Sequence, residues 1–285
     1  SADNLRTALL HVHCGDLSLR LVKLLIQQGA DPNVVRATGR TLLQEAAFEG
    51  YLEMVELLAE LGAKLDGKEE SNGLTALHYA AYFGYENTSK LLLEQGVSPN
   101  VVADNGDTPL LLASGAFSAA INKAPRPNVK IVKLLLAKGA NPNIAGFRGR
   151  LPLHNAIFNG YMDTVEALVA AKAELNVRAP QSGKYPLHYA AYFGNLKTAQ
   201  LLLKNRADPN VCSVDGDTPL FFAAGLAMDT TNKPAKPLLE MVKLLLQYGA
   251  DPISKRKNGE TPLQVALHKK RWEMVEALSA SSFAS

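Results

Sequence analysis

Six histidines are the residues of this chain best suited to acid–base or metal chemistry, and their spacing supports neither role. His11 and His13 form an H-x-H pair, which by itself is weak evidence for a metal site. The other four stand far apart along the chain, at His78, His154, His188 and His268. No nucleophile elbow, phosphate-binding loop or H-E-x-x-H motif occurs. The sequence therefore predicts no catalytic residue, no metal site, no cofactor and no enzyme activity.

Length, composition and charge limit the classes of protein that fit. At 285 residues a single globular core would be near its upper size, whereas a repeat array escapes this limit because each repeat contacts only its neighbours. The net charge of +3 gives no case for nucleic acid by itself. No run reaches the 18 or so apolar residues of a membrane span, so a soluble protein is expected. The start at Ser1 rather than Met slightly favours an exported or periplasmic protein.

A turn, two short helices and an extended link recur along the chain about every 33 residues. In one copy Gly73 lies in a turn, Thr75 begins an Ala-rich helix, and Gly84 ends that helix in the left-handed conformation. A Leu-rich helix follows and ends at Gly96. The turn glycines of the successive copies are Gly39, Gly73, Gly106, Gly149, Gly183, Gly216 and Gly259. One such copy cannot bury its apolar face alone, so the copies must stack.

The motifs within each copy resemble those of the ankyrin repeat, a β-turn plus two helices with a T-P-L-H-x-A signature. Thr-Pro-Leu stands at 108–110, 218–220 and 261–263, Leu-His at 77–78, 153–154 and 187–188, and Gly-Ala-Asp or Gly-Ala-Asn at 29–31, 139–141 and 249–251. The resemblance implies an all-α solenoid of stacked helix pairs with β-turn tips. It also implies a structural role for three histidines, whose rings would bond to turn backbone: His78, His154 and His188.

The spacing divides residues 1–285 into a single array of eight repeats. The first, 4–34, and the last, 254–285, have polar outer faces and are expected to be caps. The repeats between them are predicted at 35–67, 68–101, 102–144, 145–177, 178–211 and 212–253.

The sequence also repeats with a longer period of 110 residues, in addition to the period of about 33 residues. His78 to Gly84 reappears unchanged as His188 to Gly194. Two repeats carry about ten extra residues between their helices, at 117–127 and 227–237, and these insertions coincide under the same shift. Three repeats therefore behave as one module that is used twice, insertions included.

Aromatic residues near the end of the first helix are the leading candidates for partner contact. They are Phe48, Tyr82, Phe83, Phe158, Tyr192 and Phe193. In the family that the chain resembles, these positions face the concave surface and commonly contact partners. Aromatic residues are also common anchors of interfaces. The alternative, that the rings only pack on the neighbouring repeat, stays open.

The two insertions are the second set of candidates. Each contains Asn-Lys followed by two prolines, which reduce the entropy lost on docking. Their predicted contact residues are Asn122, Lys123, Arg126, Asn232, Lys233 and Lys236. Because such exposed loops persist in both copies of the module, we expect them to reach a partner.

Two helix ends depart from the pattern. The closing glycine is replaced by Lys172 and by Arg206, and a non-glycine residue in the left-handed conformation costs about 1 kcal/mol or more. Either these ends are capped differently or the array is locally weak there.

The sequence favours a non-catalytic protein–protein interaction module that is monomeric before it binds. The specific hypothesis is a stoichiometric inhibitor or immunity-type protein, which caps a partner enzyme with its concave face and both insertions. One alternative is a scaffold or adaptor with several protein partners. A less favoured alternative is nucleic-acid binding through a basic set near the C-terminus: Lys255, Arg256, Lys257, Lys269, Lys270 and Arg271.

Overall fold

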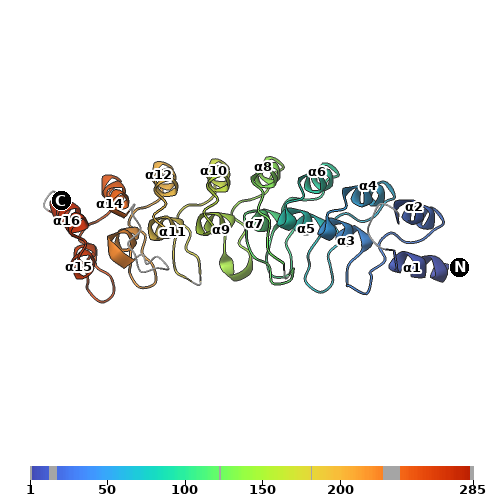
Figure 1. The fold of residues 1–285 in the computed structure, drawn as a ribbon, viewed down its shortest axis with the longest axis horizontal. Helices are drawn as coiled ribbons and strands as arrows, with labels where there is room; N and C mark the ends of the chain where they lie inside the picture. Colours follow the sequence, from blue (N-terminus) through green and yellow to red (C-terminus); the bar gives the residue numbers. More distant parts are fainter. Residues whose placement is uncertain (1, 13–17, 122, 181, 227–237, 283–285) are drawn as a thin grey trace. The chain divides into compact units, whose positions relative to one another are not determined.

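A computed structural model describes residues 2–12, 18–121, 123–180, 182–226 and 238–282 of the chain (Figure 1). The described residues form sixteen α-helices and no strand, apart from an isolated bridge between Val35 and Thr41. The predicted all-α fold is therefore confirmed. The chain divides into two compact units, Ser1–Phe147 and Arg148–Ser285. The predicted boundaries of the individual repeats stay a prediction.

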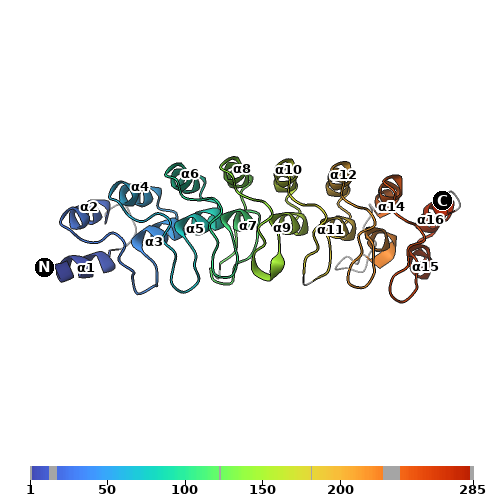
Figure 2. The same ribbon diagram turned by 180° about the vertical axis from the view of Figure 1, so that it is seen from behind.

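The first unit consists of four helix pairs. Its helices are α1 (Ala2–Leu10), α2 (Leu19–Gln27), α3 (Leu42–Glu49), α4 (Leu52–Glu60), α5 (Ala76–Phe83), α6 (Glu86–Glu94), α7 (Pro109–Ala113) and α8 (Val129–Ala137). Within this unit α3, α5 and α7 pack side by side in one layer, and α2, α4, α6 and α8 pack in a second layer (Figures 1 and 2). The core lies between the layers and is made largely of leucine and alanine.

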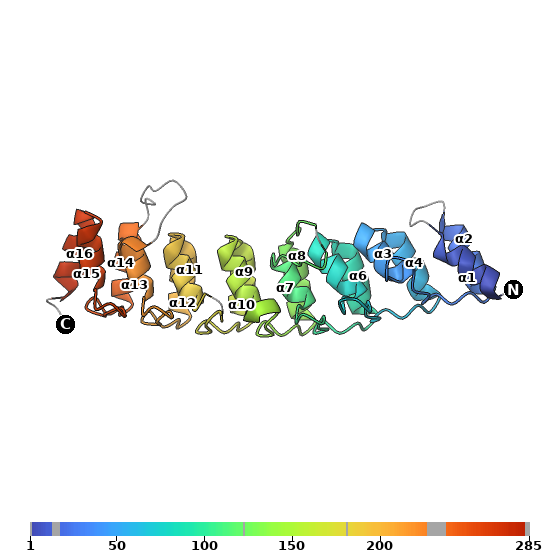
Figure 3. The ribbon, with the colours of Figure 1, turned by 90° about the horizontal axis from the view of Figure 1, so that it is seen from below.

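The second unit repeats this arrangement. Its elements are α9 (Pro152–Phe158), α10 (Met162–Ala170), α11 (Pro186–Tyr192), α12 (Leu196–Lys204), α13 (Pro219–Phe221), the π-helical turn η3 (Phe222–Leu226), α14 (Leu238–Gln247), α15 (Pro262–His268) and α16 (Trp272–Ser282). A 3-10 turn, η2 (Phe147–Gly149), lies where the two units meet in sequence. The helices of each unit run roughly parallel to one another when seen from below (Figure 3).

Histidine or glutamine at the third position of the first helix joins one repeat to the next. The backbone N–H of Thr75 donates to Nδ1 of His78 (3.1 Å), so Nε2 of that ring carries the proton and donates to the carbonyl of Asp107 (3.1 Å). His188 makes the same two bonds, to Tyr185 N and Asp217 O. The structural role expected for these histidines is confirmed.

Asparagines at the repeat exits form a second set of links. The side chain of Asn100 donates to the carbonyl of Gly139 (2.9 Å) and accepts from the backbone N–H of Asn141 (2.7 Å). Asn210 makes the equivalent pair of bonds with Gly249 and Asp251. These side chains satisfy backbone groups just after the second helix of the next repeat, α8 or α14, which would otherwise need water.

The helix ends that lack glycine keep the glycine conformation. Lys172 has a φ of 63° and Arg206 a φ of 69°, both left-handed. The next residue, Ala173 or Ala207, closes each helix with a backbone bond of 3.0 Å to a carbonyl five residues earlier. These ends are therefore capped in the same way as the others, and at a conformational cost.

Candidate protein-binding surface

The aromatic row of the first unit, Phe48, Tyr82 and Phe83, lies at the C-terminal ends of α3 and α5. Phe83 packs edge-on against both Phe48 and Tyr82, with ring centroids 5.1 Å apart in each case. Tyr82 has no exposed surface and Phe83 is 7% exposed. Only Phe48 keeps part of its surface in solvent.

The first insertion covers this row. Residues 114–128 connect α7 to α8, and within them Arg126 donates its backbone N–H to the carbonyl of Tyr82 (2.8 Å). The Tyr82 hydroxyl in turn donates to the carbonyl of Lys123. Lys123 Nζ lies 4.3 Å from the centroid of the Phe48 ring and 4.0 Å from a carboxylate oxygen of Glu49. Tyr82 and Phe83 therefore pack under the chain's own insertion, in line with the packing alternative that the sequence left open.

The charged side chains of this insertion nevertheless face solvent. Lys123 is exposed along about half of its side chain, and Arg126 is exposed as well. Asn122 lies outside the described residues. A partner could therefore touch the two cations and the edge of Phe48, whereas Tyr82 is out of its reach in this arrangement.

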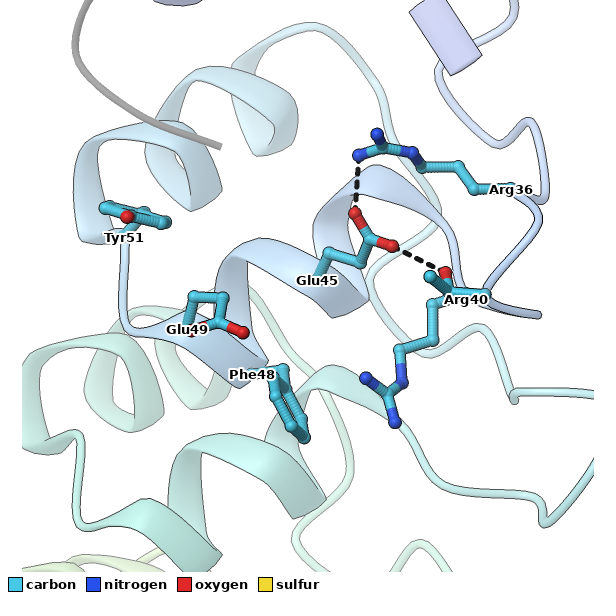
Figure 4. Close-up of a pocket in the computed structure, with 7 residues that line it drawn as sticks. Arg36, Arg40, Glu45, Phe48, Glu49 and Tyr51 are labelled. Atoms are coloured by element: carbon cyan, nitrogen blue, oxygen red, sulfur yellow. Dashed lines mark hydrogen bonds and ion pairs between the residues drawn. The ribbon is translucent and has the colours of Figure 1, made fainter. Parts of the chain in front are cut away.

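A polar pocket adjoins the row in the first unit (Figure 4). Its lining residues are Arg36, Thr38, Arg40, Glu45, Phe48, Glu49 and Tyr51. Glu45 accepts from Arg36 (2.5 Å) and from the hydroxyl of Thr38 (2.5 Å).

Arg40 fills the other side of the pocket. Its guanidinium lies over the rings of Phe48 (4.2 Å) and Tyr79 (4.9 Å) and donates to Glu69 (3.2 Å). Burial raises the pKa of Tyr79, whose hydroxyl donates to Glu69. The two carboxylates that line the pocket, Glu45 and Glu49, both lie beside cations, Glu45 at 2.5 Å from Arg36 and Glu49 at 4.0 Å from Lys123.

Among the described residues, the aromatic row of the second unit, Phe158, Tyr192 and Phe193, is more open than that of the first unit. Phe158 and Phe193 are 48% and 44% exposed, and their centroids are 5.6 Å apart at an interplanar angle of 84°. Arg150 lies 5.6 Å from the Phe158 ring, and Lys184 lies 5.0 Å from the Tyr192 ring. This surface combines exposed rings with two cations, as protein interfaces commonly do.

Three of the predicted contact residues belong to the second insertion. Asn232, Lys233 and Lys236 lie outside the described residues.

The basic set near the C-terminus is partly neutralised. Arg256 pairs with Asp217 (2.9 Å) and lies 3.6 Å from Glu260. Lys255, Lys257, Lys269 and Lys270 are exposed.

Three buried histidines have strongly shifted pKa values. Burial lowers the pKa of His78, His154 and His188 to about 4, so all three are neutral near pH 7. Across the described part of the chain, no group of three or more His, Cys, Asp or Glu side chains could hold a metal ion. None of the helices among the same residues has the length and apolarity to cross a bilayer.

Sequence reasoning found the rings but missed the charges around them. Arg40, Arg150 and Lys184 all lie over aromatic rings, and none was predicted as a contact residue. The 110-residue repeat contains a signal for one of these charges, because it aligns Arg40 with Arg150 and so indicates that both copies keep an arginine near the aromatic row.

A family model described as ankyrin repeats, in three copies, matches residues 8–103, 66–144, 88–179, 117–213, 173–231 and 187–284. The chain belongs to the ankyrin repeat family. The resemblance noted from the sequence motifs is thereby confirmed, and with it the expectation of a module that binds proteins.

Curated relatives share only part of their length with this ankyrin chain. The putative E3 ubiquitin-protein ligase XBAT31 of Arabidopsis thaliana is 31% identical over 121 residues, which are 38% of this chain and 26% of the ligase. Protein phosphatase 1 regulatory subunit 27 of Mus musculus is 30% identical over 99 residues, which are 35% of this chain and 63% of that protein. The chain thus spans less than two thirds of the length of either relative.

Two solved ankyrin domains are similar over most of the chain. The ankyrin repeat domain of human ASB11 has a TM-score of 0.64 and 27% identity, covering 85% of this chain and 98% of that one. The ankyrin repeat domain of Bcl-3 has a TM-score of 0.67 and 26% identity, covering 85% and 99%. Both likenesses support the stacked helix pairs described above.

Proposed function

We propose that this ankyrin protein is a non-catalytic, stoichiometric inhibitor or immunity-type protein that caps a partner enzyme. The observation that carries the proposal is the open aromatic row of the second unit, where Phe158 and Phe193 are nearly half exposed beside two cations. Exposed aromatic side chains that adjoin cations are typical of interface anchors. A surface of this kind costs solubility unless something covers it.

The first insertion supports a second contact. Its exposed Lys123 and Arg126 are held in place by the bonds to Tyr82, so little entropy would be lost when a partner binds them. One relative is named as a regulatory subunit of a protein phosphatase, which is consistent with an enzyme as the partner. In the proposal the protein is monomeric until it binds, and needs no cofactor.

A multi-partner scaffold is the second candidate, and the same open row would serve it. Nucleic-acid binding is less favoured, because Arg256 in the basic set is already paired with Asp217.

The test is capture of the partner from the native source, followed by titration of the purified partner. An inhibitor should abolish the activity of a partner enzyme at a molar ratio of about one to one. Its binding should weaken only modestly between low and moderate salt, whereas binding to phosphates falls steeply. A partner that binds but keeps its full activity would identify a scaffold instead.

A further inference from the structure

The two copies of the module differ in how their cations are paired. In the first unit three cations have carboxylate partners within the chain. Arg36 lies 2.5 Å from Glu45, Arg40 lies 3.2 Å from Glu69, and Lys123 lies 4.0 Å from Glu49. The charges around the first aromatic row are therefore satisfied internally.

The second unit has lost all three carboxylates. The 110-residue shift places Asn155, Asn159 and Ala179 where the first unit has Glu45, Glu49 and Glu69. The same shift keeps the rings and keeps Arg40 as Arg150, and it replaces Leu74 by Lys184. Lys184 is thus gained in the second copy, Gly146 stands where the first copy has Arg36, and none of the three carboxylates has an acidic counterpart.

Neither cation forms an ion pair in the described part of the second unit, although the Asp217 carboxylate, which is paired with Arg256, lies near enough to Lys184 to interact with its charge. No ion pair joins Arg150 or Lys184 to a carboxylate among those residues. Instead Arg150 lies against Phe158, and Lys184 lies 5.0 Å from both Tyr192 and Phe222. The neighbouring ring excludes water from one side of each cation. This lowers the local dielectric constant and strengthens the charge-assisted hydrogen bond that the cation would make to a carboxylate.

We infer that the aromatic row of the second unit binds an acidic segment of the partner protein. Carboxylates of the segment contact Arg150 and Lys184, and an apolar side chain of the segment lies on Phe158 and Phe193. The carboxylate on Arg150 takes the place that Glu69 has beside Arg40. This inference rests on the proposed function, because it names the chemistry of the same partner.

The ring geometry favours a peptide over a nucleic acid. Single-stranded nucleic acids bind by stacking successive bases on aromatic faces. Phe158 and Phe193 stand at 84° to one another, as do Tyr192 and Phe193 at 88°, so neighbouring rings do not present parallel faces. An apolar side chain, by contrast, fits the angle between two rings.

The probe is a fluorescein-labelled twelve-residue peptide with six Glu and two Trp, and its counterpart has Lys in place of Glu. Fluorescence anisotropy of the full chain should show saturable binding of the acidic peptide and none of the basic one. Arg150→Glu should weaken the acidic peptide about tenfold or more, since it places a like charge opposite the ligand. Lys204→Glu is the matched control, because Lys204 is an exposed residue of α12 outside the row and the charge change is the same.

A restoring variant tests the missing carboxylate. Ala179→Glu puts an acid back where Glu69 stands in the first copy, so Arg150 should become internally paired and peptide affinity should fall about tenfold. Circular dichroism melts establish that the variant is folded. If it is not, Arg150→Glu and Lys184→Glu, both at the surface, decide the question.

Three results would overturn the inference: no saturable binding of the acidic peptide, equal losses in Arg150→Glu and Lys204→Glu, or equal binding of a twelve-residue oligo-dT. If binding of the native partner still depended on Phe158 and Phe193, the proposed function would remain supported. Conversely, the expected peptide results together with a partner enzyme that is not inhibited would sustain the inference and refute the inhibitor role.

Discussion

Three buried histidines make the stability of the fold depend on pH. In the unfolded chain each ring has a pKa of about 6.5, whereas burial lowers the folded pKa of His78, His154 and His188 to about 4. Below pH 6.5 the unfolded state binds protons that the folded state does not. Stability is therefore full above pH 6.5 and is lost as the pH falls toward 4, by up to about 1.4 kcal/mol per pH unit for each histidine.

Glutamine supplies a control that does not titrate. Gln44 occupies the same helix position in α3, accepting from the Thr41 N–H (2.8 Å) and donating to the carbonyl of Gly67 (2.9 Å). The double variant His78→Gln, His188→Gln should therefore keep these hydrogen bonds. Its free energy of unfolding should decrease less than that of the parent between pH 6.5 and 4. Urea unfolding at several pH values measures this. An unchanged pH slope in the double variant would show that other groups cause the loss.

At the scale of the helices, three described ends hold a non-glycine residue in the left-handed conformation, at Lys172, Arg206 and Lys270. Lys172 and Arg206 hold left-handed backbone conformations that glycine adopts without cost. Lys172→Gly and Arg206→Gly should each raise the free energy of unfolding by about 0.5–1 kcal/mol, net of the greater freedom of glycine in the unfolded chain. Lys172→Ala, which removes the side chain but keeps the strain, should change it little. A glycine variant no more stable than the alanine variant would contradict the argument.

The helices were predictable because glycine, proline and threonine mark their ends locally. Thr108-Pro109 and Thr261-Pro262 each begin a helix at the expected residue. The path of the first insertion was not predictable in this way. Its two bonds to Tyr82 join residues 41 and 44 positions apart, through backbone atoms of Lys123 and Arg126, and backbone bonds of this kind do not depend on the type of side chain. Only the structure shows that it covers the row.

At the scale of the whole molecule, the duplication allows the candidate site of the second unit to be compared with its counterpart in the first unit. A shared sequence such as His78 to Gly84 and His188 to Gly194 predicts the same local fold twice, and both copies do form a helix there. The surfaces nevertheless differ, since Phe83 is 7% exposed and its counterpart Phe193 is 44% exposed. The shared local sequence determines that both α5 and α11 form. The exposure of the aromatic residue at the end of each helix depends on segments that are distant along the chain.

The central claim is that the open aromatic row of the second unit binds the partner, and affinity for the purified partner tests it most directly. Isothermal titration should show that Phe158→Ala and Phe193→Ala each weaken binding by about 1–3 kcal/mol. Melting temperatures should change little, since both rings are nearly half exposed. Trp272→Ala is the control, because Trp272 is an exposed ring of α16 outside the row, and it should bind like the parent. Unchanged affinity in the double variant Phe158→Ala, Phe193→Ala would contradict the claim.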